Sequence, residues 1–180
     1  ICMVARLTKD KGAHYLIEAY KRLDTDKKLV ICGDTSDTDD YVAQLKSMAG
    51  DNKNIIFTGF ISGDTLGQIY SNSYAVCLPS DLEGMSISLL EALSYSNAVL
   101  CSDIPENTSV CGNAALTFKK GNVDDLAQKL DFLLKNPKAA EKLRENSAEY
   151  VLSRFSWQNT AELTTELYEK ISIDKKGGNG

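Results

Sequence analysis

Short apolar runs alternate with longer segments of helical periodicity, and this alternation constrains the fold more than any other feature of the sequence. The runs are rich in Val, Ile, Leu and Cys and do not alternate between polar and apolar residues. Such runs are typical of strands that are covered on both faces of a parallel sheet. The predicted strands are Ile1–Ala5, Lys28–Cys32, Asn54–Thr58, Ala75–Leu78, Ala98–Cys101 and Ala114–Phe118.

Helical patterns follow most of these strands. The predicted helices are Gly12–Leu23, Tyr41–Met48, Ser62–Ser71, Ser86–Ser94, Asn122–Leu134, Pro137–Arg154 and Trp157–Ile171. The alternation predicts an α/β fold, a Rossmann-like doubly wound parallel sheet of about six strands with flanking helices and extra C-terminal helices. Ligands of such sheets bind beyond the carboxyl ends of the strands, so the loops that follow the strands are where we expect chemistry.

The length and charge of the chain narrow the classes of protein it can belong to. Its 180 residues suit one domain, and the polar end, 173–180, predicts a flexible tail. A net charge of −5 without any Lys/Arg-rich run argues against binding to nucleic acid. No apolar stretch approaches the roughly 20 residues of a membrane-spanning helix. The chain opens inside an apolar run without an initiating Met, so we expect it to be part of a longer protein.

Five cysteines, none of them in a C-x-x-C pair, predict buried free thiols in a reducing cytoplasm rather than disulfides or a metal site. The only histidine, His14, falls inside the first predicted helix, away from the loops, which predicts a structural or exposed side chain. We therefore expect a cytoplasmic protein.

The loop after the first strand carries Arg6 and Lys11 and ends at a glycine and a helix start. Two cations near a helix N-terminus can converge on one anion, whereas a merely solvated loop is the alternative. After the second strand comes Gly33, whose missing side chain would let a ligand approach the backbone or serve a turn. The D-x-D triplet in Asp37–Asp40 suits either a metal-bound diphosphate or the acidic start of a helix.

The most informative segment follows the fourth strand and holds two glutamates eight residues apart, Glu83 in the loop and Glu91 on the helix. Glu91 has apolar neighbours, so its carboxylate needs a partner, either a pair of ligand hydroxyls or a cation from the sheet. The backbone amides of Ser86, Ile87 and Ser88 would open the helix and suit a phosphate group.

The segment PSDLEGMSISLLEAL, preceded by VARLTKDKG, LVICGD and FTGFIS, resembles the carboxyl-terminal half of the family-four, or group 1, glycosyltransferases. The resemblance includes the late segment FSWQNTAELTTELYEKI and so spans essentially the whole chain. It implies one half of a GT-B fold, with residues 1–172 as the nucleotide-sugar donor-binding domain and the N-terminal acceptor domain absent.

The resemblance also implies a role for each matching position. Arg6 and Lys11 would contact the donor diphosphate, Glu83 the donor sugar near the reacting carbon, and Glu91 the ribose hydroxyls. The residues implied in catalysis are Glu83, Arg6 and Lys11. Those implied in donor binding are Arg6, Lys11, Gly33, Phe60, Ile61, Glu83, Met85, Ser86, Ile87, Ser88 and Glu91, with Phe60 and Ile61 beside the nucleotide base.

The implied reaction is retaining transfer of a sugar from a nucleotide-diphosphate sugar to a glycan, lipid-linked or polysaccharide acceptor, without a metal or other cofactor. The isolated domain would be inactive, and peripheral membrane association of the full enzyme stays open. Two alternatives remain: a nucleotide-sugar epimerase of the same fold, and a non-catalytic nucleotide-binding regulatory module. Retention of both glutamates and both cations argues against the second.

Two segments depart from the family pattern, and one helix carries a further expectation. Ser96-Asn97-Ala98 replaces a Gly-x-Pro turn, and we expect Asn97 to take the left-handed conformation there. Residues Ile104–Asn107 replace a Gly-Gly pair, which leaves the sugar contacts on that side undefined. The last predicted helix would return to the N-terminal domain and, in its absence, expose an apolar stripe.

Overall fold

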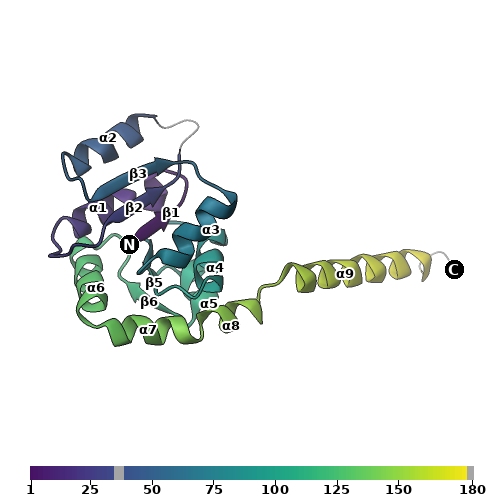
Figure 1. Cartoon of the computed structure of the whole chain (residues 1–180). Coiled ribbons are helices and arrows are strands. Elements are labelled where there is room, and N and C mark those ends of the chain that lie inside the picture. Colours follow the sequence, from purple (N-terminus) through teal and green to yellow (C-terminus); the bar gives the residue numbers. More distant parts are fainter. Residues whose placement is uncertain (35–38, 178–180) are drawn as a thin grey trace.

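A computed structural model of the chain describes residues 1–34 and 39–177 and places six strands in one sheet (Figure 1). All neighbouring strands are parallel, in the order β3-β2-β1-β4-β5-β6. The predicted doubly wound α/β fold is thereby confirmed. The strands are β1 (Cys2–Val4), β2 (Leu29–Cys32), β3 (Ile55–Gly59), β4 (Val76–Leu78), β5 (Val99–Ser102) and β6 (Ala115–Phe118).

The strand order reverses beside β1. The chain proceeds outward from β1 to β2 and β3, then returns to pair β4 with β1 and proceeds outward again on the other side. The loops after β1 and β4 therefore flank the topological switch point, the place where open parallel sheets bind ligands.

Nine α-helices and one short 3₁₀ helix, η1, are assigned within the described residues. Their bounds are η1 (Lys9–Lys11), α1 (Ala13–Tyr20), α2 (Asp39–Ala49), α3 (Gly63–Asn72), α4 (Ile87–Ser94), α5 (Pro105–Cys111), α6 (Val123–Lys135), α7 (Pro137–Glu145), α8 (Ser147–Leu152) and α9 (Trp157–Gly177).

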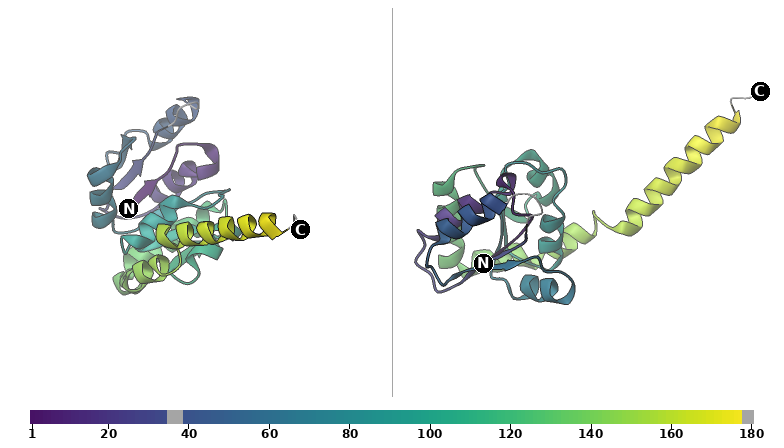
Figure 2. Two further views of the ribbon diagram at one scale, coloured as in Figure 1. Left: turned by 90° about the vertical axis from the view of Figure 1, so that its right-hand side faces the viewer. Right: turned by 90° about the horizontal axis from the view of Figure 1, so that it is seen from above.

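The helices cover both faces of the sheet (Figures 1 and 2). Side chains of α1, α2 and α6 pack into one buried cluster with one face of the sheet, and those of α3, α4, α5 and α8 into a second cluster on the other. The β-strands are apolar on both sides because each face is covered by such a layer. The two layers hold the strands so that their carboxyl ends, and the loops beyond them, occupy one edge of the domain.

Several helix predictions are wrong in detail. The predicted helix Pro137–Arg154 divides into α7 and α8, because Asn146 leaves helical geometry at φ −120° and ψ 2°. Helix α5 was not predicted, since its sequence, PENTSVC, lacks a helical apolar period. Its signals were Pro105 at the first turn and Glu106 near the N-terminus. Helix α9 continues to Gly177 instead of ending at Ile171, so part of the predicted tail is helical.

The turn before β5 also differs from expectation. Ser96, not Asn97, takes the positive φ, at 55°. Asn97 is buried, and both its backbone N–H and its Nδ2 donate hydrogen bonds to the carbonyl oxygen of Ala92, at 3.1 and 3.2 Å. The asparagine therefore closes the C-terminus of α4 through its side chain rather than through its backbone conformation.

Helix α9 extends away from the rest of the chain in Figure 1 and in the right-hand view of Figure 2. Its large apolar side chains are exposed, and at 100° per residue they fall on one side of the helix. They are Trp157, Leu163, Leu167, Tyr168 and Ile171. The predicted exposed apolar stripe is confirmed, and we call it the α9 stripe.

All five cysteines are buried and free, as predicted. Burial in the apolar core raises the pKa of the Cys77 thiol to about 12, so this thiol is unreactive near neutral pH. Nowhere in the described parts of the chain is a helix both long and apolar enough to span a membrane.

Candidate functional site at the switch point

The loops after β1 and β4 are packed directly against each other. Gly12 has a φ of +70°, and a Cβ there would lie 2.0 Å from the carbonyl oxygen of Pro79. The backbone N–H of Asp81 donates to the carbonyl of Asp10 at 2.7 Å, and the Tyr15 hydroxyl donates to Asp81 Oδ2 at 3.1 Å. Only a glycine allows this approach, so the sequence at residue 12 sets the distance between the two loops.

This contact brings together Lys11 and Glu83, two of the predicted site residues. Lys11 Nζ lies 2.9 Å from Glu83 Oε2, and the two side chains are only 13% and 10% exposed. Lys11 Nζ also donates to the carbonyl oxygen of Leu82 at 3.3 Å and lies 3.4 Å from Asp10 Oδ2. The cation at the switch point is therefore shared between two carboxylates, an arrangement that the sequence did not predict.

A buried chain of hydrogen bonds holds the second oxygen of Glu83. Ser80 Oγ donates to Glu83 Oε1 at 2.7 Å, while the Ser80 carbonyl accepts from Ser102 Oγ at 2.5 Å. Asn107 Nδ2, from α5, donates to Ser102 Oγ at 3.1 Å. Ser80, Ser102 and Asn107 are almost completely buried, so these bonds act in a low dielectric and fix the loop strongly. Sequence reasoning missed all three residues, although Ser80 stands in the same loop as Glu83.

Helix α4 begins beside the same loop. Ser86 is its N-cap, and the Ser86 hydroxyl accepts from the backbone N–H of Leu89 at 3.3 Å. Within the described chain, the backbone N–H groups of Ser86, Ile87 and Ser88 donate to no protein acceptor. Three unpaired donors at the positive end of a helix can stabilise an anion, and the binding of a phosphate there stays a prediction.

Glu91 lies one turn further along α4 and contacts a tyrosine. The Tyr70 hydroxyl, from α3, donates to Glu91 Oε2 at 3.1 Å. The Tyr70 side chain is 1% exposed, and its ring stacks on Tyr95 with centroids 5.4 Å apart. Burial first, and then the negative charge of Glu91, raise the pKa of the Tyr70 phenol, which keeps it a hydrogen-bond donor. The expected partner of Glu91 was a ligand or a cation, and Tyr70 was missed.

The family model for glycosyl transferases group 1 matches residues 1–150. The chain belongs to this family. The glycosyltransferase MJ1607 of Methanocaldococcus jannaschii is 32% identical over 182 residues, which cover 98% of this chain and 46% of that protein.

Solved structures agree with this assignment at the level of the fold. A glycosyltransferase from Rickettsia africae matches with a TM-score of 0.88 and 22% identity over 99% of this chain and 48% of its own. Anabaena Alr3699/HepE, solved in complex with UDP and glucose, matches with a TM-score of 0.84 and 19% identity over 96% and 47%. The fold is that of a GT-B glycosyltransferase, and the chain spans about half the length of the relatives it matches.

The other predicted site residues of this group 1 glycosyltransferase domain are more scattered. Arg6 is exposed in the β1 loop and pairs with none of the described side chains. Gly33 has a φ of +149°, and a Cβ there would lie 1.8 Å from the Ala5 carbonyl oxygen, so its close neighbour is the chain's own backbone. Met85 is exposed at the start of α4.

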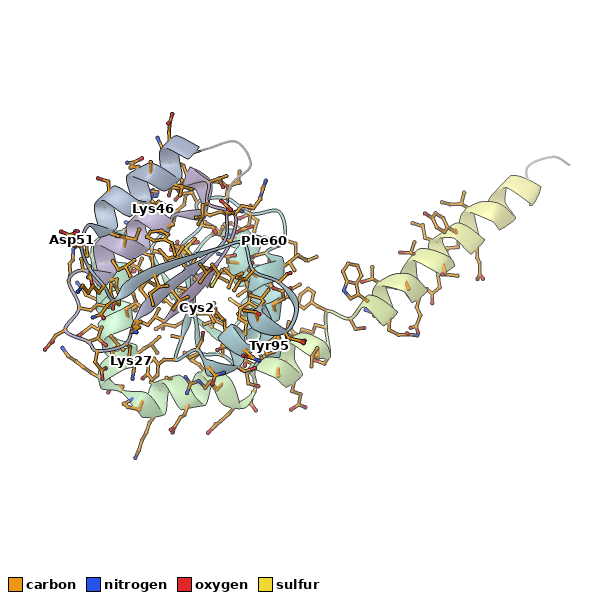
Figure 3. All side chains as sticks on the ribbon, turned by 45° about the horizontal axis from the view of Figure 1, so that its top comes forward. Cys2, Lys27, Lys46, Asp51, Phe60 and Tyr95 are labelled. Atoms are coloured by element: carbon orange, nitrogen blue, oxygen red, sulfur yellow. The ribbon has the colours of Figure 1, made fainter. Side chains whose placement is uncertain are left out.

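Phe60 and Ile61 follow β3, the edge strand, two strands from β1. Phe60 is 75% exposed, and Figure 3 shows it on the opposite side of the domain from Lys27 and Asp51, which precede β2 and β3. Both residues therefore lie at the carboxyl edge of the sheet, though not in contact with the Lys11–Glu83 pair. Their contact with the nucleotide base of the donor stays a prediction.

The remaining sequence candidates lie apart from the site. The D-x-D triplet begins outside the described residues, and Asp39 and Asp40 open α2. Among the described residues, no cluster of His, Cys, Asp and Glu has the geometry to hold a metal ion. His14 is half-buried, and its Nδ1 shares a hydrogen bond with the Tyr41 hydroxyl at 2.7 Å, so its structural reading is confirmed.

Proposed function

We propose that this domain binds the donor of a retaining glycosyltransferase, which moves a sugar from a nucleoside-diphosphate sugar to an acceptor held by a further domain of the protein. The observation that carries the proposal is the Lys11–Glu83 ion pair at the switch point, beside the open N-terminus of α4. Membership of the group 1 family and the fold shared with an enzyme solved with UDP and glucose support it.

The diphosphate of the donor suits the amides of Ile87 and Ser88 together with Arg6. Lys11 is already balanced by Asp10 and Glu83, whereas Arg6 in the same loop is exposed and has no ion-pair partner among the described residues, so it can pair with an incoming anion. Its planar guanidinium can bind two phosphate oxygens at once. Lys11 then has a different role. Its ammonium group is paired with the Glu83 carboxylate and so connects that carboxylate to the part of the site that would hold the diphosphate.

The proposed reaction breaks the bond between the anomeric carbon and the β-phosphate oxygen, and the electron pair leaves with the nucleoside diphosphate. The acceptor hydroxyl forms the new bond on the same face of the sugar and gives its proton to the departing β-phosphate oxygen. Negative charge grows on the diphosphate as the bond breaks, so Arg6, Lys11 and the α4 amides stabilise the transition state more than the ground state. Glu83, held by Lys11 and Ser80, presents a carboxylate to the sugar.

The proposal is tested with the protein at its full natural length. A panel of nucleoside-diphosphate sugars is offered with candidate acceptors, and the product linkage is read by NMR. An α-linked product from an α-linked donor supports retaining transfer, and an inverted linkage contradicts it. Release of an altered nucleotide sugar without any transfer would instead identify an epimerase, and failure to bind any nucleoside diphosphate would favour the regulatory module.

Substitution of Lys11 and Arg6 separates their two tasks. Lys11→Ala should lower kcat by on the order of a hundredfold, since it removes one electrostatic contact to the transition state and leaves Glu83 without its cation. Arg6→Ala should lower kcat by a similar order and also raise KM for the donor, because its guanidinium binds the diphosphate in the ground state as well as in the transition state. The matched control is Lys46→Ala, which removes an exposed cation from α2 and should change neither constant. Near-wild-type kinetics for both site variants would overturn the assigned roles.

A further inference from the structure

Tyr70 is buried and hydrogen-bonded to Glu91, and the proposed reaction assigns it no role. It lies on α3 with its ring inside the core and its hydroxyl directed at Glu91 Oε2, 3.1 Å away. This hydrogen bond joins α3 to α4.

The ring itself is held in place from its other side. Tyr95 stacks on Tyr70 with an interplanar angle of 23°, and Gly67 makes room for Tyr95, since a Cβ at residue 67 would lie 2.9 Å from the Tyr95 hydroxyl oxygen. A phenol restricted in this way can donate in one direction only. The hydrogen bond from this phenol therefore fixes the rotation of the Glu91 carboxylate.

The geometry of Glu91 leaves one oxygen for a ligand. Oε2 accepts from Tyr70, whereas Oε1 has no hydrogen-bond partner within the described chain, and the residue is partly exposed. Glu91 stands four residues after Ile87, which is about 6 Å along the helix axis. A ligand whose phosphate lies at the α4 N-terminus can thus place a second polar group at the free oxygen.

We propose that Tyr70 is a positioning residue that holds Glu91, on which the family resemblance places the ribose hydroxyls, and that the preference of the site for ribonucleotides over 2′-deoxyribonucleotides depends on this tyrosine. This inference rests on the proposed function, because it requires a nucleoside diphosphate at α4. A bound ligand removes water from the Glu91 carboxylate. If the ligand lacks the hydroxyl, the second carboxylate oxygen stays unpaired and the ligand binds more weakly, which is the source of the selectivity.

The test is a calorimetric titration of the full-length protein with uridine, guanosine and adenosine diphosphates and with their 2′-deoxy counterparts. The wild-type protein should bind its preferred ribonucleotide about tenfold more tightly than the deoxy form. Tyr70→Phe keeps the ring and its stacking but removes the donor. It should weaken ribonucleotide binding by about threefold to tenfold and leave deoxyribonucleotide binding unchanged.

Two further variants distinguish positioning from a loss of structure. Tyr20→Phe is the matched control, because Tyr20 is equally buried but donates to the Lys27 carbonyl, at 2.8 Å, before β2. It should leave both affinities unchanged. In a Glu91→Gln background, Tyr70→Phe should have no further effect on the preference for ribose.

Equal weakening of both nucleotide forms in Tyr70→Phe, or no change in either, overturns this inference while the proposed function stands. Failure of the wild-type protein to bind any nucleoside diphosphate overturns the proposed function, and the inference with it. The wild-type titration therefore separates the two failures.

Discussion

Lys11 and Arg6 show how two cations in one loop acquire different tasks. Lys11 is mostly buried between Asp10 and Glu83, whereas Arg6 is exposed and pairs with none of the described side chains. Removing one partner of a buried ion pair leaves an uncompensated charge, at a cost of about 3 kcal/mol or more. The sequence placed both cations in the right loop, but it could not show that one of them is already paired, because its partner is distant along the chain.

His14 gives a prediction for the dependence of stability on pH. Desolvation by burial lowers the pKa of its imidazole. The negative charges of Asp81 and Glu18 oppose this shift, and the positive charge of Lys9 adds to it. A histidine whose pKa is lower in the folded state binds fewer protons than in the unfolded state. Its contribution to stability is therefore complete above the unfolded pKa of about 6.5 and is lost as pH falls toward the folded value.

The free energy of unfolding, measured with urea, should accordingly be smaller at pH 5.5 than at pH 7.5. Because His14 is the only histidine, His14→Gln should remove most of this difference. Its NMR titration gives the folded pKa directly. A folded pKa above 6.5, or stability that rises as the pH falls from 7.5 to 5.5, contradicts the prediction.

At the scale of elements, the sequence predicted the strands far better than the joints between elements. The six strands are recognisable because each is a buried apolar run, and burial on both faces is a local property of the sequence. The break between α7 and α8 at Asn146, and the existence of α5, depend on how short polar segments pack in the fold. The periodicity of the local sequence carries no information about that packing. The same limit applies to the site, since Ser80 and Tyr70 act through partners that only the fold brings near.

Gly12 provides the sharpest test of how the elements position the site. Gly12→Ala forces a side chain against the Pro79 carbonyl and should separate the loops that hold Lys11 and Glu83. Gly50→Ala is the matched control, since Gly50 has a similar φ of +59° but its Cβ would meet nothing closer than 3.9 Å. The control should cost about 1–2 kcal/mol in the free energy of unfolding, from backbone strain alone.

Gly12→Ala should cost clearly more than this, and it should also weaken donor binding, which Gly50→Ala should not. Urea unfolding and nucleotide titration measure the two effects. Equal destabilisation by the two substitutions, with donor binding unchanged, would show that the contact between the loops does not position the site.

At the scale of the whole molecule, the domain core and α9 differ in the burial of their apolar side chains. The core buries its apolar side chains on both faces of the sheet, while the α9 stripe is exposed, with Trp157 85% exposed. Exposed apolar patches of this kind mark interaction surfaces or sites of self-association. The chain spans about half the length of the relatives it matches, and a further domain that covers the α9 stripe stays a prediction.

A chain ending at residue 156 should therefore keep the melting temperature of the 180-residue chain within about 2 °C, and it should self-associate less. A chain ending at Asn146 is the control, because it also removes Val151, which is buried against α4. That control should melt several degrees lower. A large loss of stability on removal of α9 alone would contradict the separation of α9 from the core.

The site as a whole is tested most directly by NMR mapping of nucleotide binding on this domain. Backbone amide shifts are followed while uridine, guanosine or adenosine diphosphate is added at millimolar concentration. The predicted result is that Ile87 and Ser88 shift most, together with the loop that contains Arg6 and Lys11, while the amides before β2 and β3 do not move. Shifts confined to those amino ends, or none at α4 with any of the three nucleotides, would contradict a donor site at the switch point.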